Sequence, residues 1–358
     1  MIEHVPDPVL RGAIRANCVR RLTRERVRGE AGQRAFRRQL RTAPIALDVE
    51  KANEQHYEVP VELFRLVLGP RLKYSCCHWP AGVATLAEAE DAMLALTCAR
   101  AGVEDGMELL DLGCGWGSLS FWLAERYPSS RVLAVSNSTR QRAWIESEAA
   151  RRGLDRIEVR TADANVFEPG RRFDCVLSVE MMEHARNYPA LLRRVAGWLE
   201  PDGRLFVHVF SHRRFAYPFS SGWMARNFFT AGTMPSHDLL PSLADGLALE
   251  RRWAVGGGHY ARTSEAWLER LDGRHAEVLR ASSPTATAPT RRAGSRCGGS
   301  SSWPARSSGA SAAAASGASR TTASRPPEAR SGVPRGGNGL ACRSSAARRR
   351  TLRRSARP

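Results

Sequence analysis

The stretch LLDLGCGWGSLSFWLAERYP, residues 109–128, decides the fold of this chain. An apolar run ends at Asp111, a glycine-rich turn follows, and an apolar segment with helical spacing begins after Gly117. This order predicts a strand, a tight turn and a helix. Glycines in such a turn tolerate positive φ angles and let a ligand approach the backbone, and the first N–H groups of a helix have no partner within it. The stretch therefore predicts a cradle for a nucleotide-type cofactor.

Two phosphate-binding motifs do not match this turn, because GxGxG is shorter than the dinucleotide fingerprint GxGxxG and lacks the GK[ST] ending of a phosphate loop. A purely structural turn is the alternative interpretation. The Asp before the first Gly favours the cofactor interpretation, since DxGxGxG after a buried strand resembles motif I of class I S-adenosylmethionine-dependent methyltransferases. The resemblance implies that Asp111, Gly113 and Gly115 belong to the cofactor site.

The charge of the chain is concentrated at one end. The 358 residues are enough for one large or two ordinary domains, and they carry 54 basic and 36 acidic side chains, a net charge of +18. Residues 281–358 hold 15 Arg and one Glu, or +14, which leaves +4 for residues 1–280. The nearly neutral body gives no reason to expect a specific nucleic-acid partner.

Cysteine usage and hydropathy bear on the compartment. The eight cysteines include no CxxC pair, which fits reduced thiols better than a disulfide framework, and we expect no metal site. No apolar run reaches the roughly 18 residues of a transmembrane helix, and the first residues lack the apolar core of a secretory signal. We therefore expect a cytoplasmic protein, while its oligomeric state stays open.

Strand and helix patterns alternate after the glycine turn. This alternation predicts a doubly wound α/β fold with a mainly parallel sheet that helices cover on both faces. In such sheets ligands bind at the carboxyl ends of the strands. The predicted strands are 132–135, 157–161, 173–179 and 204–209, and the predicted helices are 85–101, 139–152 and 188–199, with a turn at 201–203.

Polar side chains follow three of these strands, as a binding crevice requires. They are Ser136, Asn137, Ser138 and Gln141 after the second strand of the sheet, Asp163 and Ala164 after the third, and Glu180, Glu183 and His184 after the fourth.

The N-terminal 45 residues place arginines among apolar residues at helical spacing, which predicts one or two amphipathic helices. A solvated basic face is the simpler interpretation, and contact with an anionic membrane surface is the functional one. Three regions follow from this and from the composition: a helical extension that forms a cap and lid (1–80), a methyltransferase domain (81–280) and an Arg/Ser/Ala-rich tail (281–358).

Six segments in order carry a family resemblance: YSCCHWP, TLAEAE, DLGCGWG, SNSTRQ, VEMMEH and FVHVF. Together they resemble the cyclopropane-fatty-acyl-phospholipid synthase family, and within it the coclaurine-type N-methyltransferase branch, from about Asn53 to Asp272. The resemblance implies S-adenosylmethionine as the cofactor. The residues that it assigns to the cofactor site are Tyr74, Ser75, Gly113, Gly115, Asn137, Gln141, Asp163 and Ala164.

The resemblance leaves two classes of methyl acceptor open. In the N-methyltransferase branch a Glu-His pair that matches Glu183 and His184 accepts the proton of an amine, and we expect this reaction. In the lipid branch, methylation of an unsaturated acyl chain creates a carbocation, and bicarbonate is held as the base by residues that match Cys76, Glu183 and His208. As structural alternatives, Cys76 is a small buried hydrophobe, His208 a core histidine and Glu180 a solvated strand end.

The region after the fifth strand predicts a lid and one more strand. Residues 211–236 show little periodicity, so we expect a lid over the acceptor pocket, with a strand at 249–255 that extends to His259 and Tyr260, and a helix from Ser264 to about Arg280. The candidate walls of the pocket are Phe215, Tyr217, Phe228, Phe229 and Met234.

From Ala281 the composition collapses into Ser, Ala, Arg, Pro, Gly and Thr, which predicts disorder. Serine codons of the TC type, read one base out of step, have T at the centre and encode Leu, Phe, Ile or Val, so we hypothesise a frameshift near Arg280 and Ala281 that replaced the authentic C-terminus. The closing antiparallel strand of the sheet, with an acceptor-side Tyr or Phe of the family, is then missing, and the strand near Leu249 has no partner. The rival interpretation is a basic polyanion-binding protein with a vestigial methyltransferase body.

Overall fold

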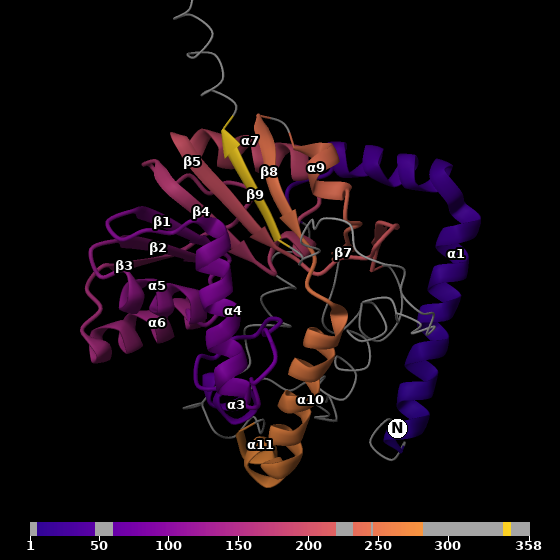
Figure 1. Cartoon of the computed structure of the whole chain (residues 1–358), viewed down its shortest axis with the longest axis horizontal. Helices are drawn as coiled ribbons and strands as arrows, with labels where there is room; N and C mark the ends of the chain where they lie inside the picture. Colours follow the sequence, from indigo (N-terminus) through magenta and orange to yellow (C-terminus); the bar gives the residue numbers. More distant parts are fainter. Residues whose placement is uncertain (1–5, 47–59, 220–231, 245, 282–338, 345–358) are drawn as a thin grey trace, which may run out of the picture.

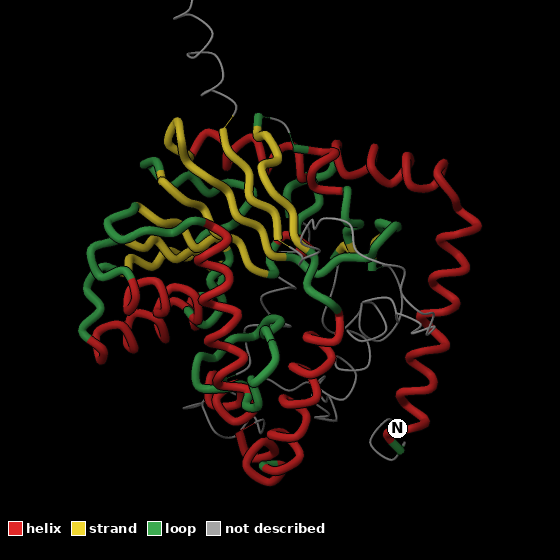
Figure 2. The backbone as a smooth tube through the Cα atoms, in the orientation of Figure 1, coloured by secondary structure: helices red, strands yellow, loops and turns green. Residues whose placement is uncertain are grey.

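The computed structural model describes residues 6–46, 60–219, 232–244, 246–281 and 339–344. Its centre is a seven-stranded sheet in the order β3-β2-β1-β4-β5-β9-β8, with β1 to β5 parallel and β9 antiparallel to both of its neighbours (Figures 1 and 2). The strands are β1 (Glu108–Leu112), β2 (Arg131–Ser136), β3 (Ile157–Thr161), β4 (Phe173–Val179), β5 (Leu199–His208), β8 (Leu247–Trp253) and β9 (Gly339–Ser344), and a separate hairpin joins β6 (Tyr217–Pro218) to β7 (Thr233–Met234).

Helices cover both faces of the sheet, as the alternating pattern predicts. On one face α4 (Leu86–Ala101), α5 (Ser118–Arg126) and α6 (Thr139–Arg152) pack on alternate residues of β1 and β2, because those strands are buried on both sides. The other face packs against α7 (Tyr188–Trp198), α9 (Leu239–Leu243) and the end of α1 (Asp7–Thr42). The remaining helices are α3 (Val61–Val67), α10 (Gly257–Gly273), α11 (His275–Ala281) and the one-turn 3-10 helix η1 (Met182–His184).

Local signals explain why several helices begin and end where they do. Thr85 and Glu88 form a capping box at the start of α4, and Gly102 ends that helix in the left-handed conformation. Ser138 caps α6, which ends at the left-handed Gly153, so the predicted bounds of this helix are confirmed. No helix in the described parts of the chain is long and apolar enough to cross a bilayer.

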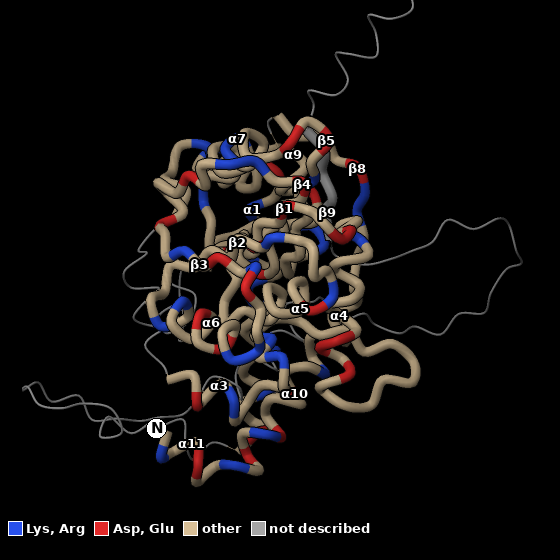
Figure 3. The backbone as a smooth tube through the Cα atoms, turned by 90° about the vertical axis from the view of Figure 1, so that its left-hand side faces the viewer, with Lys and Arg blue, Asp and Glu red and all other residues tan. Residues whose placement is uncertain are grey.

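Element α1 consists of two helical segments, the first along the outside of the molecule and the second across the sheet (Figure 1). The bend lies at Gly29, whose φ of 55° and ψ of −157° break the helix, while beyond it Phe36 and Leu40 are buried against α7. Elsewhere on the body, basic and acidic residues are interspersed, in agreement with its small net charge (Figure 3).

Two predicted boundaries are wrong. Residues 201–203 do not form a turn before β5 but lie within it, where Gly203 passes so close to β4 that an added Cβ would stand 2.8 Å from the Phe173 carbonyl oxygen. The predicted strand at 249–255 ends at Trp253, and His259 and Tyr260 lie in the first turn of α10. The sequence gives no sign of this helix start, because three glycines occupy positions 256–258 and glycine is a poor helix former.

One segment of the tail pairs with the sheet. Gly339–Ser344 forms β9 between β5 and β8, so β8 has a neighbouring strand in the structure. The unpaired edges of β5 and β8 leave room for one strand, and a short extended segment there satisfies the backbone groups of both. Residues 282–338 and 345–358, on which the disorder and frameshift hypotheses depend, lie outside the described residues, as do Phe228 and Phe229.

Candidate active site

The glycine turn after β1 is tight at both ends and open in the middle. Gly113, Gly115 and Gly117 have φ angles of 90°, 55° and 82°. A Cβ at Gly113 would stand 2.6 Å from the Met181 side chain, and one at Gly117 would stand 2.9 Å from Phe121. At Gly115 nothing lies within 4 Å, so this position combines a backbone only glycine adopts easily with free space. A ligand can therefore approach the backbone at Gly115, as the sequence predicts.

Asp111 shapes this turn from inside the protein. Its side chain is buried and accepts a hydrogen bond of 2.7 Å from the Ser120 hydroxyl, which ties β1 to the first turn of α5. Burial raises the pKa of Asp111 to about 6, although the Ser120 hydrogen bonds oppose this. The carboxyl thus fixes the cradle, and its direct contact with a cofactor stays a prediction.

The next two strand ends are also closed by local hydrogen bonds. The Ser136 hydroxyl donates to Gln141 Oε1 (2.5 Å) and accepts from the Ser138 backbone N–H (3.0 Å). Asp163 Oδ1 accepts both from the backbone N–H of Asn165 (2.8 Å) and from its side chain (2.9 Å). Because β3, β2 and β1 are neighbours, the structure brings the predicted residues Asn137, Gln141, Asp163 and Ala164 to the same edge of the sheet as the glycine turn.

Residues 74–80 (YSCCHWP), called the YSCC segment below, connect to this edge of the sheet through aromatic contacts. Phe64 of α3 packs between Tyr74, at a ring-centroid distance of 5.4 Å, and Trp116 of the glycine turn, at 5.0 Å. Tyr74 is 41% exposed, and it also contacts Trp267 of α10. Ser75 is buried and accepts a hydrogen bond from Lys73. Tyr74 therefore lies close to the predicted cofactor cradle, whereas the place of Ser75 in the cofactor site stays a prediction.

The YSCC segment is fixed to α10 by one threonine and one histidine. Thr263 Oγ1 accepts hydrogen bonds from the Cys77 backbone (3.1 Å) and from the Trp79 indole (2.9 Å). His259 Nδ1 accepts from the Trp79 backbone N–H (2.9 Å). Sequence analysis missed both residues, because their partners lie some 180 positions earlier in the chain.

Glu180 connects the segments on the acceptor side of the site, where we expect the methyl acceptor to bind. The alternative interpretation of Glu180, a solvated strand end, predicts that its side chain is exposed. Its side chain is 6% exposed, and its φ of 48° is unusual for a residue other than glycine. Oε1 accepts from the Cys76 backbone N–H (2.9 Å), and Oε2 accepts from the Tyr260 hydroxyl (2.9 Å). The interpretation as a solvated strand end is therefore wrong, since this carboxyl joins three distant segments.

His208 lies beside Glu180 as a neutral imidazole. Its Nε2 stands 3.8 Å from Glu180 Oε1, and burial, with Lys73 and Arg100, lowers the pKa of His208 to about 3. The chain thus places Cys76, His208 and Tyr260 around one carboxylate. Of the three residues that would hold bicarbonate in the lipid branch, Cys76 already donates its backbone N–H to Glu180, so this donor is not available to a second anion.

Glu183 and His184 lie on η1, which the Tyr188 hydroxyl holds by donating to the Met182 carbonyl (2.9 Å). Glu183 is 1% exposed, and its Oε2 has no hydrogen-bond partner among the described residues. Burial raises the pKa of Glu183 well above its usual value, and the neighbouring Glu180 raises it further. His184 is only half-buried. The site therefore contains two adjacent buried carboxyl groups, one of which is hydrogen-bonded and one of which is not.

Comparisons with known proteins agree with this arrangement. Residues 47–288 match the family model of mycolic acid cyclopropane synthetase. The (S)-coclaurine N-methyltransferase of Thalictrum flavum subsp. glaucum is 40% identical over 254 residues, which are 69% of this chain and 70% of that protein.

Solved structures give the same family. A crystal structure of coclaurine N-methyltransferase bound to N-methylheliamine and SAH is 30% identical, with a TM-score of 0.75 and 95% of both chains covered. A cyclopropane synthase of Mycobacterium tuberculosis is 26% identical, with a TM-score of 0.58 over 66% of this chain and 87% of that chain. The resemblance and the cofactor predicted from the sequence are thereby confirmed: the chain is an S-adenosylmethionine-dependent methyltransferase and belongs to the mycolic acid cyclopropane synthetase family.

Proposed function

We propose that this enzyme methylates an amine and that Glu183 accepts the proton that the amine must lose. The observation that carries the proposal is the buried Glu183 carboxyl, whose Oε2 has no partner among the described residues. A buried polar atom without a hydrogen bond costs free energy, and a ligand that donates one removes the cost. The N–H of an amine or ammonium group is such a donor.

The two carboxyl groups suit a cationic acceptor. Burial raises the pKa of both Glu180 and Glu183 because it disfavours their charged forms. A cation bound between them opposes this effect, so an ammonium group is attracted to the site. A carboxylate with a raised pKa is also the stronger base, which lets Glu183 take the ammonium proton and free the nitrogen lone pair. We propose that His184, half-buried next to it, is the second member of this Glu-His pair.

The remaining requirement is alignment. The bound cofactor supplies a methyl group on a positively charged sulfur. Residues of the acceptor side must then hold the nitrogen in line with that methyl group and keep water out, since alignment provides much of the acceleration in such a transfer. Cyclopropane formation stays the less supported alternative, because the Cys76 N–H, which would face its bicarbonate, already donates to Glu180.

A methylation assay with two substrate classes tests this proposal. The full chain is incubated with S-adenosylmethionine and either secondary alkylamines that carry an aromatic ring elsewhere or vesicles of an unsaturated phospholipid, and products are identified by mass spectrometry. We expect a methylated amine, and we expect Glu183→Gln to lower kcat by about 10²–10⁴-fold while cofactor binding stays unchanged.

The matched control is Glu146→Gln, which removes an exposed carboxylate on α6. Methylated acyl chains without methylated amine, or a normal kcat in Glu183→Gln, would contradict the proposal.

We also propose that the outer face of α1 contacts an anionic membrane surface. Val9, Val19 and Val27 are 59%, 63% and 83% exposed. At about 100° per residue, Val9 and Val27 share one azimuth and Val19 lies beside it, so the three form one strip. Exposed arginines flank this strip on both sides, Arg15 and Arg26 on one and Arg20, Arg24 and Arg28 on the other.

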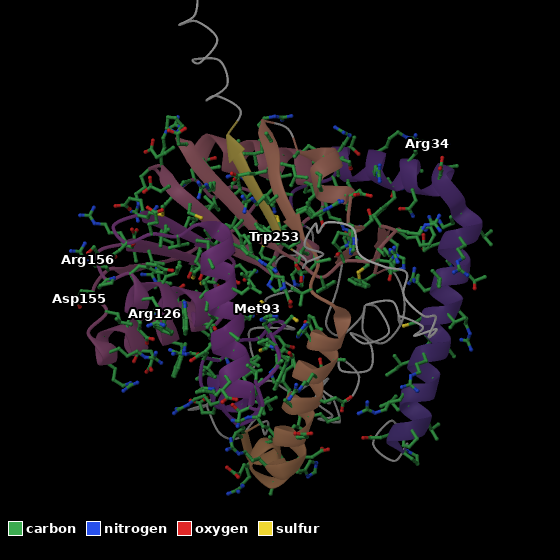
Figure 4. All side chains as sticks on the ribbon, in the orientation of Figure 1. Arg34, Met93, Arg126, Asp155, Arg156 and Trp253 are labelled. Carbon is green, nitrogen blue, oxygen red and sulfur yellow. The ribbon has the colours of Figure 1, made fainter. Side chains whose placement is uncertain are left out.

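An apolar strip between rows of arginines is typical of helices that lie in a membrane interface. The arginines supply attraction to acidic headgroups, roughly 1 kcal/mol each near the surface, and the valines supply a small buried area. Beyond the bend, Arg34 lies on the outer side of α1, away from the sheet (Figure 4). This face thus provides charge complementarity to acidic lipid.

Sedimentation with vesicles tests this surface. We expect the full chain to partition to vesicles that contain phosphatidylglycerol more than to neutral ones, and we expect Val19→Gln with Val27→Gln to weaken this partitioning by about tenfold. The control Val166→Gln changes a valine that is 74% exposed on the methyltransferase domain and should have no effect. Equal partitioning of all three proteins would refute the membrane role of α1, because the arginines of residues 281–358 would then account for binding to the vesicles.

A further inference from the structure

Lys73 is an unusual residue in this chain. Of the 54 basic residues, 52 are arginines and only Lys51 and Lys73 are lysines. Lys73 is also 3% exposed, whereas basic side chains are seldom fully buried unless they have partners. A lysine carries its charge on a compact ammonium group, while a guanidinium is broad and planar. A buried lysine in such an arginine-rich chain therefore indicates a site that requires a compact cation.

The contacts of Lys73 lead directly to the acceptor site. Its Nζ donates to the Ser75 hydroxyl and to the Cys76 carbonyl oxygen (2.8 Å). The N–H of the same Cys76 donates to Glu180 Oε1 (2.9 Å). Lys73 thus holds Cys76, the residue whose backbone N–H donates to the Glu180 carboxylate.

A second buried carboxylate fixes Lys73 itself. Glu90 of α4 is fully buried and accepts from the backbone N–H groups of Arg71 (2.9 Å) and Lys73 (3.3 Å). This contact sets the path of the chain before the YSCC segment and fixes the backbone of Lys73. Its charge then acts on Glu180: burial raises the pKa of Glu180, and Lys73 is the strongest of the effects that lower it.

We propose that Lys73 is the positioning residue of the acceptor site, which supplies the counter-charge of Glu180 and holds the Ser75–Cys76 turn against it. With Lys73 in place, Glu180 stays ionised and attracts the cationic amine, while Glu183 is the carboxyl that exchanges a proton. The catalytic consequence rests on the proposed amine reaction, whereas the effect on Glu180 does not. Lys73 itself touches neither substrate nor cofactor in this proposal.

Infrared titration of the carboxyl groups tests the proposal without any substrate. The C=O stretch of protonated carboxylic acids is followed against pH in a Glu183→Gln background, because Glu180 and Glu183 influence each other's titration, and the part that Glu180→Gln removes there belongs to Glu180. In Lys73→Gln, which keeps an N–H donor but loses the charge, we expect the midpoint of this part to move up by about one pH unit or more, since a nearby opposite charge favours the ionised form. Arg156→Met, which removes an exposed cation far from the site, should leave the midpoint unchanged.

A purely structural role of Lys73 predicts a different result. It predicts lower stability without a change in the midpoint, so an unchanged midpoint in Lys73→Gln would overturn the proposal, as would an infrared band that Glu180→Gln does not alter. Should Lys73→Gln fail to fold, the chain with Lys73 in place still decides: a Glu180 midpoint above about pH 7 would overturn the proposal, because Glu180 would then be protonated where Lys73 is proposed to keep it ionised. With an amine substrate, the acid limb of kcat/KM should move to higher pH in Lys73→Gln by the same interval. If no amine is methylated, the infrared result still decides the role of Lys73.

Discussion

The two halves of the active site are assembled in different ways. On the cofactor half, each turn has a side-chain hydrogen bond between residues close in sequence: Asp111 and Ser120 are nine positions apart, Ser136 and Gln141 five, and Asp163 and Asn165 two. On the acceptor half, the partners are distant: Cys76 and Glu180 are 104 positions apart, Glu180 and Tyr260 80, and Cys77 and Thr263 186.

This difference has a physical consequence. A turn closed by local hydrogen bonds depends mainly on the strand and helix on either side, even where a distant segment adds a contact, as Ala46 does at Asn165. The acceptor half exists only when the YSCC segment, the end of β4 and α10 have all been brought together. Substitutions on the cofactor half should therefore act on the cofactor directly, and those on the acceptor half should act through the packing of whole segments.

The largest effect is expected at Gly113. Alanine there must adopt a φ of 90°, and its Cβ would stand 2.6 Å from Met181. Backbone strain and overpacking each cost roughly 1–3 kcal/mol, so we expect Gly113→Ala to lower the free energy of unfolding by several kcal/mol and to abolish cofactor binding. Urea unfolding and titration calorimetry with S-adenosylmethionine measure the two effects.

Substitutions at two other glycines separate the effect of backbone strain on the fold from the effect of blocking the approach of the cofactor. Gly115→Ala has the same backbone problem but meets no atom within 4 Å, so it should keep the fold and lose cofactor affinity. Gly197→Ala lies in the helix α7 with free space around it and should be neutral or slightly stabilising. If Gly115→Ala binds the cofactor as tightly as wild type does, the turn is structural and is not the cradle.

The sequence predicts the cofactor half well because its signals are local. The bounds of α6, β3 and β4 agree with the predicted ones, and the polar residues after β2 and β3 meet at one edge of the sheet. These elements depend on periodicity, caps and glycines, all of which are visible within some fifteen residues.

The acceptor half could not be predicted to the same depth. The first Glu of VEMMEH gives no local sign that it is buried, because the donors that make its burial possible belong to Cys76 and Tyr260. The start of α10 is hidden by three glycines, and β9 comes from a segment whose composition predicts no strand at all. In each case long-range contacts outweigh local propensity. One local signal was available: Lys73 is one of only two lysines in this arginine-rich chain.

A smaller and more selective effect is expected at Thr263, and it tests whether the two halves are separable. Thr263→Val keeps the size of the side chain but removes the oxygen that accepts from Cys77 and Trp79, which leaves two buried N–H groups without this acceptor. Such a loss costs about 1–3 kcal/mol. Part of the cost appears as looser attachment of the YSCC segment to α10, so we expect a severalfold higher KM for the amine with a nearly unchanged Kd for S-adenosylmethionine.

The control is Thr23→Val, which removes an exposed hydroxyl whose only assigned bond lies within α1. It should change neither constant. Equal weakening of cofactor and amine binding in Thr263→Val would mean that Tyr74 transmits the disturbance to the glycine turn through Phe64, so that the two halves form one cooperative unit. An effect confined to the amine would mean that the acceptor half can change its substrate while the local turns keep the cofactor in place.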